Sequence, residues 1–391
     1  MKGIVLKSVE RIAYMGIISF GLISLLGDII YEGARGIISP YLETLGATAV
    51  VVGVVGGLGD FLGYALRLVS GYIADVKRTY WLLVFLGYGL LVSIPLLAFA
   101  NLWQIAIILI LVERIAKALR SPARDTLLSV ISSSVGSGKA FGLHELLDQI
   151  GAILGPGIVA LTLLVTGNYS NSFIVLIIPY AILMLVLTLT YSNLKTYTSS
   201  MMPSAAARGG EKGAKLPLRF KIYTMAVFFN TLGLIHILLI LYKASPIMAS
   251  WAIPLLYLFV QAVDAVSAII SGYAYDVFGM KILVIPFALS IIPPILAVTG
   301  GLWNIIVASI VFGIILGMQE STYRAAVSDT VPVGVRGTAY GIFNSLYGLG
   351  YLVSGYVYGL LLDSGLVEIS ALYALITQLA SITLLCKSTF S

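Results

Sequence analysis

The sequence predicts an all-α membrane protein with twelve transmembrane helices in two pseudo-symmetric six-helix bundles. Three observations lead to this fold class: the apolar composition, a regular series of long apolar segments, and the placement of Lys and Arg between those segments. The chain has 391 residues, of which 59% are hydrophobic and only 10% are charged. A soluble domain has about 25% charged residues, so a chain this apolar needs lipid around it.

The apolar segments are bounded by charged residues and by Gly, Pro and Asn, and each is long enough to cross a bilayer, which takes about 20 residues. Backbone groups in lipid must be hydrogen-bonded within the chain, so these segments are expected to be helices. They lie at roughly 12–38, 47–73, 80–100, 102–123, 140–166, 171–193, 218–242, 248–273, 281–299, 302–323, 337–362 and 366–386. Little sequence is left between them for a soluble catalytic domain, and we therefore expect no enzyme activity.

The distribution of basic residues predicts the orientation, because Lys and Arg are in excess in cytoplasmic loops. With the N-terminus inside, the inner links hold most of the basic residues, and the outer links hold only Lys243. The net charge of +6 therefore indicates a membrane topology signal and no nucleic-acid partner. We expect both termini in the cytoplasm and a multi-pass protein of the plasma membrane.

The two halves of the chain resemble each other at an offset of about 200 residues. Gly71 and Asp75 recur as Gly272 and Asp276, at the same predicted depth. Because six is an even number, both copies have the same orientation, which is a parallel repeat about an axis along the membrane normal.

This repeat predicts three parts of the chain. They are an N-terminal bundle at 1–193, a cytoplasmic linker at 194–217 and a C-terminal bundle at 218–391. The linker is rich in Ser, Ala, Gly, Lys and Arg, a composition that is typical of flexible connections.

The link after the second segment points to a known family. Residues 71–78 read GYIADVKR, which resembles the G-x-L-A-D-R-x-G-R-K signature of the major facilitator superfamily, and residues 272–281 are a second copy. The first copy lacks the second glycine and has Val76 in place of a basic residue. The resemblance implies a cytoplasmic gate in which the Asp pairs with basic residues such as Arg120 or Arg124. The predicted gate residues are Gly71, Asp75, Lys77, Arg78, Arg124, Gly272, Asp276 and Arg324. The alternative is that the basic residues of this link only set the topology.

The fifth apolar segment carries a second motif. Gly151, Gly155 and Pro156 lie in the sequence GAILGPG, which resembles the G-x-x-x-G-P core of the motif that marks antiporters in the same superfamily. Small residues let helices approach closely, and proline bends a helix. The resemblance implies efflux by a transporter that is similar to the proton-coupled, drug/proton antiporter-like branch.

Ionisable residues inside the apolar segments are the strongest functional signal, because a charge at the bilayer centre costs about 2.5–3.5 kcal/mol on insertion scales. The predicted proton-coupling residues are Asp28, Glu32, Asp60, Glu113 and Asp148, and the predicted substrate or switch residues are Arg35, Arg114, Lys117 and His236. We favour Asp28, since it lies about mid-span, where a carboxylate can release its proton when a cation or water approaches. The alternative for each is a permanently paired structural ion. Most of them lie in the N-terminal half, so we expect that half to carry ion coupling and the C-terminal half to shape the substrate cavity.

The resemblance implies a monomeric secondary transporter that moves a small organic solute by alternating access, most simply by proton-coupled export, with no cofactor. One alternative is a divalent-metal exporter similar to ferroportin, with Asp28 and His236 as ligands, although two ligands are few for metal selectivity. A second alternative is an uptake symporter or uniporter of the same fold. The sequence predicts neither the substrate nor the direction of transport.

Overall fold

The computed structural model describes residues 2–132, 135–201, 216–332 and 335–390, and within them every regular element is a helix. Residues 202–215 of the predicted linker lie outside the described residues. Ten stretches of the described chain are long and apolar enough to cross a membrane. One of them, Ala252–Thr299, is 48 residues long. The 29-residue helix α5 (Trp103–Ile131) is not among the ten, because four charged residues lie in its first 18 residues.

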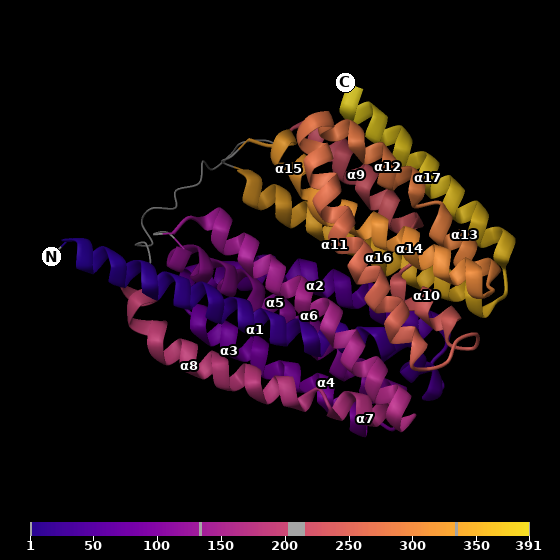
Figure 1. The fold of residues 1–391 in the computed structure, drawn as a ribbon. Helices are drawn as coiled ribbons and strands as arrows, with labels where there is room; N and C mark the ends of the chain where they lie inside the picture. The colour runs from indigo at the N-terminus through magenta and orange to yellow at the C-terminus, as the bar shows by residue number, and fades with distance from the viewer. Residues whose placement is uncertain (1, 133–134, 202–215, 333–334, 391) are drawn as a thin grey trace. The chain divides into compact units, whose positions relative to one another are not determined.

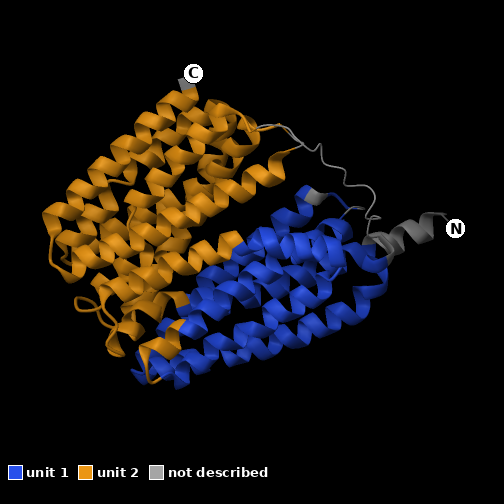
Figure 2. Ribbon diagram, turned by 180° about the vertical axis from the view of Figure 1, so that it is seen from behind, with its two compact units in different colours: residues 1–34, 66–100, 108–208 blue, residues 35–65, 101–107, 209–391 orange. Residues whose placement is uncertain are grey.

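Contacts between the helices divide the chain into two compact units (Figure 2). Unit 1 comprises residues 1–34, 66–100 and 108–208, and unit 2 comprises residues 35–65, 101–107 and 209–391. Helices α1 (Lys2–Thr44) and α2 (Ala49–Lys77) therefore contribute to both units, and α5, which lies mainly in unit 1, contributes its first five residues to unit 2. This division follows contacts, whereas the predicted bundles follow the sequence repeat, and those bundles stay a prediction.

Unit 1 combines long helices with one irregular span (Figure 1). Besides its parts of α1 and α2, its elements are α3 (Tyr80–Gly89), η1 (Leu90–Val92), α4 (Ser93–Leu96), η2 (Leu97–Phe99), α5, α6 (Ser137–Thr166), α7 (Tyr169–Ile174) and α8 (Ile177–Met201). The irregular span runs from α3 to η2 and contains Pro95, which cannot donate a backbone hydrogen bond.

Unit 2 contains more interrupted helices than unit 1. Besides its parts of α1 and α2, its elements are α9 (Leu218–Gly233), α10 (Ile237–Ala244), α11 (Ala252–Phe278), η5 (Gly279–Leu283), α12 (Val284–Leu289), α13 (Ile292–Thr299), α14 (Leu302–Met318), η6 (Gln319–Tyr323), α15 (Arg324–Thr330), α16 (Arg336–Asp363) and α17 (Val367–Phe390). Helix α9 packs against α16 and α17, and α11 packs along α14. The element η6 is a single π-helical turn, and residues 234–236 break the path between α9 and α10. Both interruptions matter for the sites described below.

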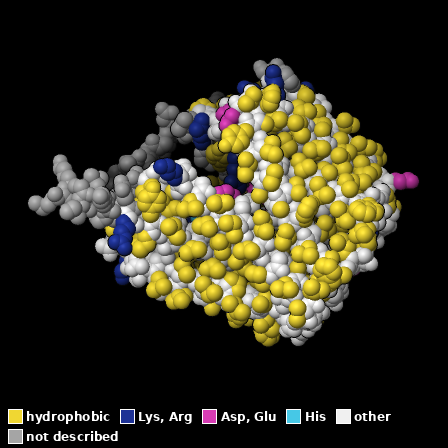
Figure 3. All heavy atoms as spheres, viewed as in Figure 1, with side chains coloured by type: hydrophobic (Ala, Val, Ile, Leu, Met, Phe, Trp, Pro, Cys, Tyr) yellow, Lys and Arg dark blue, Asp and Glu magenta, His cyan; other side chains and the backbone are white. Residues whose placement is uncertain are grey.

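The exposed surface is apolar and the interior is partly polar, which is the distribution expected of a protein that lipid surrounds. The face drawn in Figure 3 is covered mainly by hydrophobic side chains. Large apolar residues such as Val165, Leu161 and Trp303 are more than 60% exposed, whereas Asp264, Arg120 and Glu113 are at most 3% exposed.

Glycines bring α2 and α16 into backbone contact within unit 2. A Cβ atom on Gly53 would collide with the carbonyl of Gly355, and one on Gly57 would lie 2.5 Å from the Cα of Leu352. At the end of α16, the carboxylate of Asp363 accepts hydrogen bonds of 2.9 and 3.0 Å from the first two backbone N–H groups of α2. These donors have no partner within their own helix, so α16 also caps α2.

The two copies of the repeated link each contain a residue with positive φ. Gly279 has φ +59° and ψ −147°, a combination that is essentially restricted to glycine. Arg78, at the matching position of the first copy, has φ +55°. Positive φ costs a non-glycine residue about 1–2 kcal/mol, so the first copy places a strained arginine where the second copy has glycine.

We expect Gly279→Ala to lower the stability by about 1 kcal/mol, because alanine disfavours positive φ. The matched control is Gly272→Ala in α11, the helix that ends directly before Gly279. An added Cβ at Gly272 meets nothing within 4 Å, and alanine favours the helix by about 1 kcal/mol over glycine. The measurement is thermal unfolding of the purified protein. Equal effects of the two substitutions would contradict the prediction, and Arg78→Gly should cause no loss of stability.

Candidate functional site

A cluster of charged and aromatic side chains lies in unit 1, where α1 meets α5 and α6. Asp28 and Glu32 on α1 are 8% and 5% exposed. The carboxylate of Asp28 is hydrogen-bonded to the side chain of Tyr31. It also interacts electrostatically with Lys117, Glu32 and Asp148. The ammonium of Lys117 lies 4.0 Å from the Glu32 carboxylate and 4.1 Å from the centre of the Tyr31 ring. Four of the predicted site residues are therefore neighbours.

A chain of polar contacts continues this cluster along α6. Arg124 donates a 2.7 Å hydrogen bond to the hydroxyl of Ser24 and lies 3.9 Å from Asp148. Nε2 of His144 lies 3.2 Å from the same hydroxyl and 3.6 Å from Asp148. Arg124 also forms a 2.9 Å ion pair with Asp125. A change of charge at Asp148 would thus act on one arginine and one histidine at the same time.

Helix α5 supplies two further buried cations. Arg114 forms a 3.4 Å contact with its neighbour Glu113, and both are at most 5% exposed. Arg120 is 2% exposed and lies over the rings of Tyr31 and Tyr88 at 5.4 and 4.9 Å. From the sequence, Arg120 was expected to set the topology or to pair with the gate Asp, and this contact with the tyrosine rings was missed. Its spacing of three residues after Lys117 was the available signal, because such residues share a helix face.

The small residues of α6 lie directly against α1 at the Asp28 turn. A Cβ on Gly151 would collide with the carbonyl of Leu25 and would lie 2.9 Å from Cβ of Asp28. A Cβ on Gly155 would lie 2.5 Å from the carbonyl oxygen of Ile29. The antiporter-like motif therefore forms the surface on which the predicted proton-coupling helix rests. Pro156 lies within α6, which continues to Thr166.

We expect Gly155→Ala to destabilise the protein by about 1–3 kcal/mol, because the new methyl group meets backbone atoms that cannot rotate away. The control on the same helix is Gly142→Ala, where an added Cβ meets nothing within 4 Å. Thermal unfolding in detergent compares the two. A Gly155→Ala protein as stable as the Gly142→Ala protein would show that α6 does not rest on α1 at this point.

A second predicted pair lies in unit 2, at the break before α10. Nε2 of His236 lies 3.1 Å from the carboxylate of Asp60 on α2. Nδ1 of the same ring accepts a 3.2 Å hydrogen bond from the backbone N–H of Leu238 and so caps α10. Since Nδ1 accepts, the hydrogen of the neutral ring lies on Nε2 and is donated to Asp60. Gly56 makes room for the imidazole, because a Cβ there would lie 2.5 Å from the ring.

Arg35 is the remaining predicted residue on α1, and it belongs to unit 2. Its guanidinium donates a 3.5 Å hydrogen bond to the hydroxyl of Tyr257 on α11. One helical turn further, Ser39 donates a 2.7 Å hydrogen bond to the carbonyl of Leu238. The final turns of α1 are thus fixed to α11 and to Leu238, which follows the helix break.

We expect Asp60→Asn and His236→Asn each to lower the melting temperature, and the double variant to lose less than the sum. Asn at position 236 can still cap α10. The double-mutant cycle formed by the two single variants and the double variant therefore isolates the contact between residues 60 and 236. Contacting residues commonly couple by about 0.5–3 kcal/mol. Additive losses would argue against the contact, and Asp60→Asn combined with Asn304→Ala, at the start of α14, is the additive control.

Two of the predicted gate residues in the first copy, Asp75 and Gly71, lie against residues of the same unit. Asp75 accepts a 2.9 Å hydrogen bond from Tyr80, and a Cβ on Gly71 would lie 3.4 Å from Pro122. In the second copy Asp276 is exposed, as are Lys77 and Arg78 in the first. The gate itself stays a prediction.

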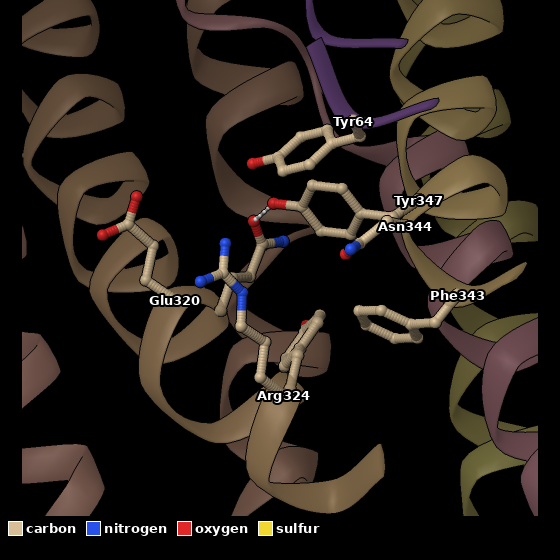
Figure 4. A pocket seen from close by; sticks show the side chains of 8 residues that line it. Tyr64, Glu320, Arg324, Phe343, Asn344 and Tyr347 are labelled. Carbon is tan, nitrogen blue, oxygen red and sulfur yellow. Dashed lines mark hydrogen bonds between the residues drawn. The ribbon is translucent and has the colours of Figure 1, made fainter. Parts of the chain in front are cut away.

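A pocket in unit 2 contains residues that the sequence did not single out. It is small, with a cavity volume of about 20 Å³, and it is lined by Tyr64, Gln319, Glu320, Tyr323, Arg324, Phe343, Asn344 and Tyr347. In Figure 4 the Arg324 guanidinium and the Tyr64 hydroxyl point toward the Tyr347 hydroxyl. That hydroxyl donates a 2.8 Å hydrogen bond to Gln319. Of the predicted gate residues, Arg324 therefore lines a pocket. No sequence motif marked Gln319, because amides and tyrosines are common in membrane helices.

The fold and these buried ionisable clusters define a polytopic α-helical transport protein. The sequence profile of the Major Facilitator Superfamily matches residues 20–355. The chain therefore belongs to the major facilitator superfamily, and it is a secondary transporter for a small-molecule substrate and not an enzyme.

Two relatives are similar to most of this chain. An uncharacterized protein of Mycobacterium tuberculosis is 39% identical over 346 residues, which cover 86% of this chain and 83% of that protein. An uncharacterized MFS-type transporter of Methanocaldococcus jannaschii is 28% identical over 353 residues, covering 86% of this chain and 87% of the relative.

Two solved structures share the fold. The nucleoside transporter NupG has a TM-score of 0.68 at 16% identity, over 94% of this chain and 98% of that chain. The POT family transporter PepTSo has a TM-score of 0.71 at 12% identity, over 95% of this chain and 97% of that chain. At such identities the likeness concerns the fold alone.

Proposed function

We propose that this transporter exports a small organic solute in exchange for protons, by alternating access across the plasma membrane. The proposal includes twelve membrane crossings. Two of them lie in the stretch Ala252–Thr299, and one is α5, which its charged residues make less apolar than the other crossings. An even number of crossings and the Lys and Arg distribution support cytoplasmic termini. The protein is proposed to act as a monomer.

The observation that carries the proposal is the contact between the α6 glycines and the Asp28 turn of α1. Gly151 and Gly155 leave no side chain between the two helices, so sliding or tilting of α6 changes the surroundings of Asp28. A carboxylate responds to such a change by binding or releasing a proton. Helix movement and proton exchange are thereby connected at one contact.

The neighbours of Asp28 supply the charge that such an exchange needs. Lys117 approaches Glu32 to 4.0 Å, and Asp148 lies between the Asp28 cluster and Arg124. When a proton leaves one carboxylate, a nearby cation can stabilise the anion. The cluster therefore supports a shared proton site that comprises Asp28, Glu32 and Asp148, with Asp28 as the principal group.

The geometry of His236 speaks against the metal-export alternative. Both ring nitrogens already have partners, Asp60 and the backbone of Leu238, so a metal would have to displace one of them. Among the described residues, no group of three or more His, Cys, Asp or Glu side chains is arranged to hold a metal ion.

We expect Asp28→Asn to abolish accumulation driven by a pH gradient and to leave counterflow, the exchange of labelled for unlabelled solute, within about twofold of wild type. Asparagine has nearly the shape of aspartate but cannot carry the proton. The measurement uses proteoliposomes with labelled theophylline, glucose and ethidium as probes, each with and without a pH gradient.

The matched control is Glu145→Gln, the same chemical change at an exposed residue of α6, which should leave gradient-driven transport intact. Gradient-driven accumulation that persists in Asp28→Asn would remove this residue from coupling. Wild-type transport that ignores the pH gradient for every probe would refute the proton-coupled mechanism.

A further inference from the structure

The break between α9 and α10 is fixed on its α9 side by hydroxyl groups. Three backbone carbonyls at the end of α9 and in the break, those of residues 232–234, accept hydrogen bonds from side chains of α16 and α17. The donors are Tyr373, Tyr358 and Ser354, respectively. Serine and tyrosine hydroxyls keep their hydrogens below about pH 10, so this side of the break is held in the same way at every physiological pH.

The α10 side of the break is capped by a group that titrates. His236 is the N-cap residue of α10, and its Nδ1 accepts a 3.2 Å hydrogen bond from the backbone N–H of Leu238. The first N–H groups of a helix have no partner within the helix, and Ser, Thr, Asn or Asp usually supplies the acceptor. Imidazole is the side chain whose charge ordinarily changes between about pH 5 and 8. The start of α10 therefore depends on a hydrogen bond that a proton can remove.

A second proton on the imidazole is incompatible with this cap. Nε2 lies 3.1 Å from the carboxylate of Asp60 and donates its hydrogen to it. When the ring is charged, both nitrogens carry a hydrogen, so Nδ1 would face the N–H of Leu238 as one donor against another. The ring can bind the second proton only when these two groups have separated. Proton binding and opening of the first turn of α10 are therefore coupled.

Asp60 gives protons access to the pair and supplies a counter-charge. Its side chain is 25% exposed, whereas that of His236 is 5% exposed. A charged ring would form an ion pair with Asp60, which offsets part of the cost of a buried charge. Further titratable groups beside the pair are the phenols Tyr351, Tyr347 and Tyr64, which carry no charge below about pH 10.

Few other charges lie on the elements that pack against α10. Helices α13 and α14 have no charged side chain, and α16 has charged residues only at its two ends. The buried charge of α11 is Asp264, and α10 itself has Lys243 in its last turn. On α1, Arg35 is bonded to α11, and Glu43 interacts with a tyrosine near the end of α10. In the described part of the chain, Asp60 is therefore the charged group that contacts the imidazole.

We propose that His236 is a proton-operated switch of the helix break. The neutral ring caps α10. The ring that binds a second proton at Nδ1 releases the N–H of Leu238 and stays paired with Asp60 through Nε2. The proton comes from water, no other covalent bond forms or breaks, and the pair gains one positive charge.

The released turn of α10 is connected to α1. Ser39 donates a 2.7 Å hydrogen bond to the carbonyl of Leu238, so a displacement of Leu238 would also displace the last turns of α1. The α9 side of the break stays fixed by its three hydroxyls, which confines the change to α10 and α1. The switch goes beyond the proposed exchange at Asp28, because it lies in unit 2 and works without a solute.

The test observes the ring and the helix in the same sample, the full-length protein in lipid nanodiscs without solute. The chain has two histidines, so ¹⁵N-histidine labelling gives two sets of ring signals, and the set that is absent from His236→Asn belongs to His236. The nitrogen chemical shifts report which ring nitrogens carry hydrogen. Hydrogen–deuterium exchange, corrected for the intrinsic effect of pH, reports the protection of residues 237–241.

At high pH we expect hydrogen on Nε2 of His236 alone. As the pH falls from about 8 to 5, Nδ1 should gain a hydrogen. The protection of residues 237–241 should then fall about fivefold, the loss expected of one N-cap, and with the same midpoint. The end of α9 should keep its protection. In His236→Asn, whose amide caps without titrating, the protection of α10 should not depend on pH.

Three results would each overturn the switch. The ring of His236 gains no second hydrogen in this pH range, or it gains one while residues 237–241 stay protected, or His236→Asn loses protection as wild type does. If His236→Asn does not fold, His144→Asn assigns the ring signals and the two midpoints of wild type decide. None of these measurements involves a solute or a pH gradient, so Asp28→Asn in proteoliposomes tests the proposed exchange separately.

Discussion

Close contact between helices at glycine is the constraint on which the two ionisable sites depend. In unit 1, Gly151 and Gly155 of α6 lie on α1 beside Asp28, and in unit 2, Gly53 of α2 lies on Gly355 of α16. Between lipid-embedded helices there is little hydrophobic driving force, so close packing and polar contacts supply the attraction. On α2, Gly56 leaves room for the His236 ring, whose Nε2 lies 3.1 Å from the Asp60 carboxylate. A larger side chain at Gly151, Gly155, Gly53 or Gly56 would therefore collide with the neighbouring element.

The two units use their polar residues differently. In unit 1 the charges of α1, α5 and α6 form a connected group, in which Arg124 contacts both Asp148 and Ser24. In unit 2 uncharged amides and tyrosine hydroxyls predominate, with Gln319 accepting from two tyrosines. Charged groups suit proton exchange, whereas hydroxyl and amide groups suit recognition of a neutral solute. The proposed division between coupling and substrate recognition follows from this chemistry. The sequence predicted such a division between the N- and C-terminal halves, whereas Arg35 and Asp60 of the N-terminal half belong to unit 2.

Helix interruptions place the polar groups where they can act. The break at 234–236 allows His236 to cap α10 with one nitrogen and to reach Asp60 with the other. The π-helical turn η6 places Gln319 and Arg324 on one pocket wall. In lipid an interruption is tolerated only where other protein groups satisfy the freed backbone. The interruptions therefore lie beside buried side chains that can do so.

The sequence by itself determined the helical membrane class, the family, the positions of the apolar segments and the residues that carry charge inside them. These properties are local, because hydropathy, helix length and motif spacing are read along a single segment. Only the tertiary structure decided which charges meet: Asp60 and His236 are 176 residues apart in the chain, and no periodicity connects them. The same holds for the pocket around Gln319, which gathers residues from α2, η6, α15 and α16. Such groupings depend on how distant helices pack, and packing is set by the shapes of all the side chains at once.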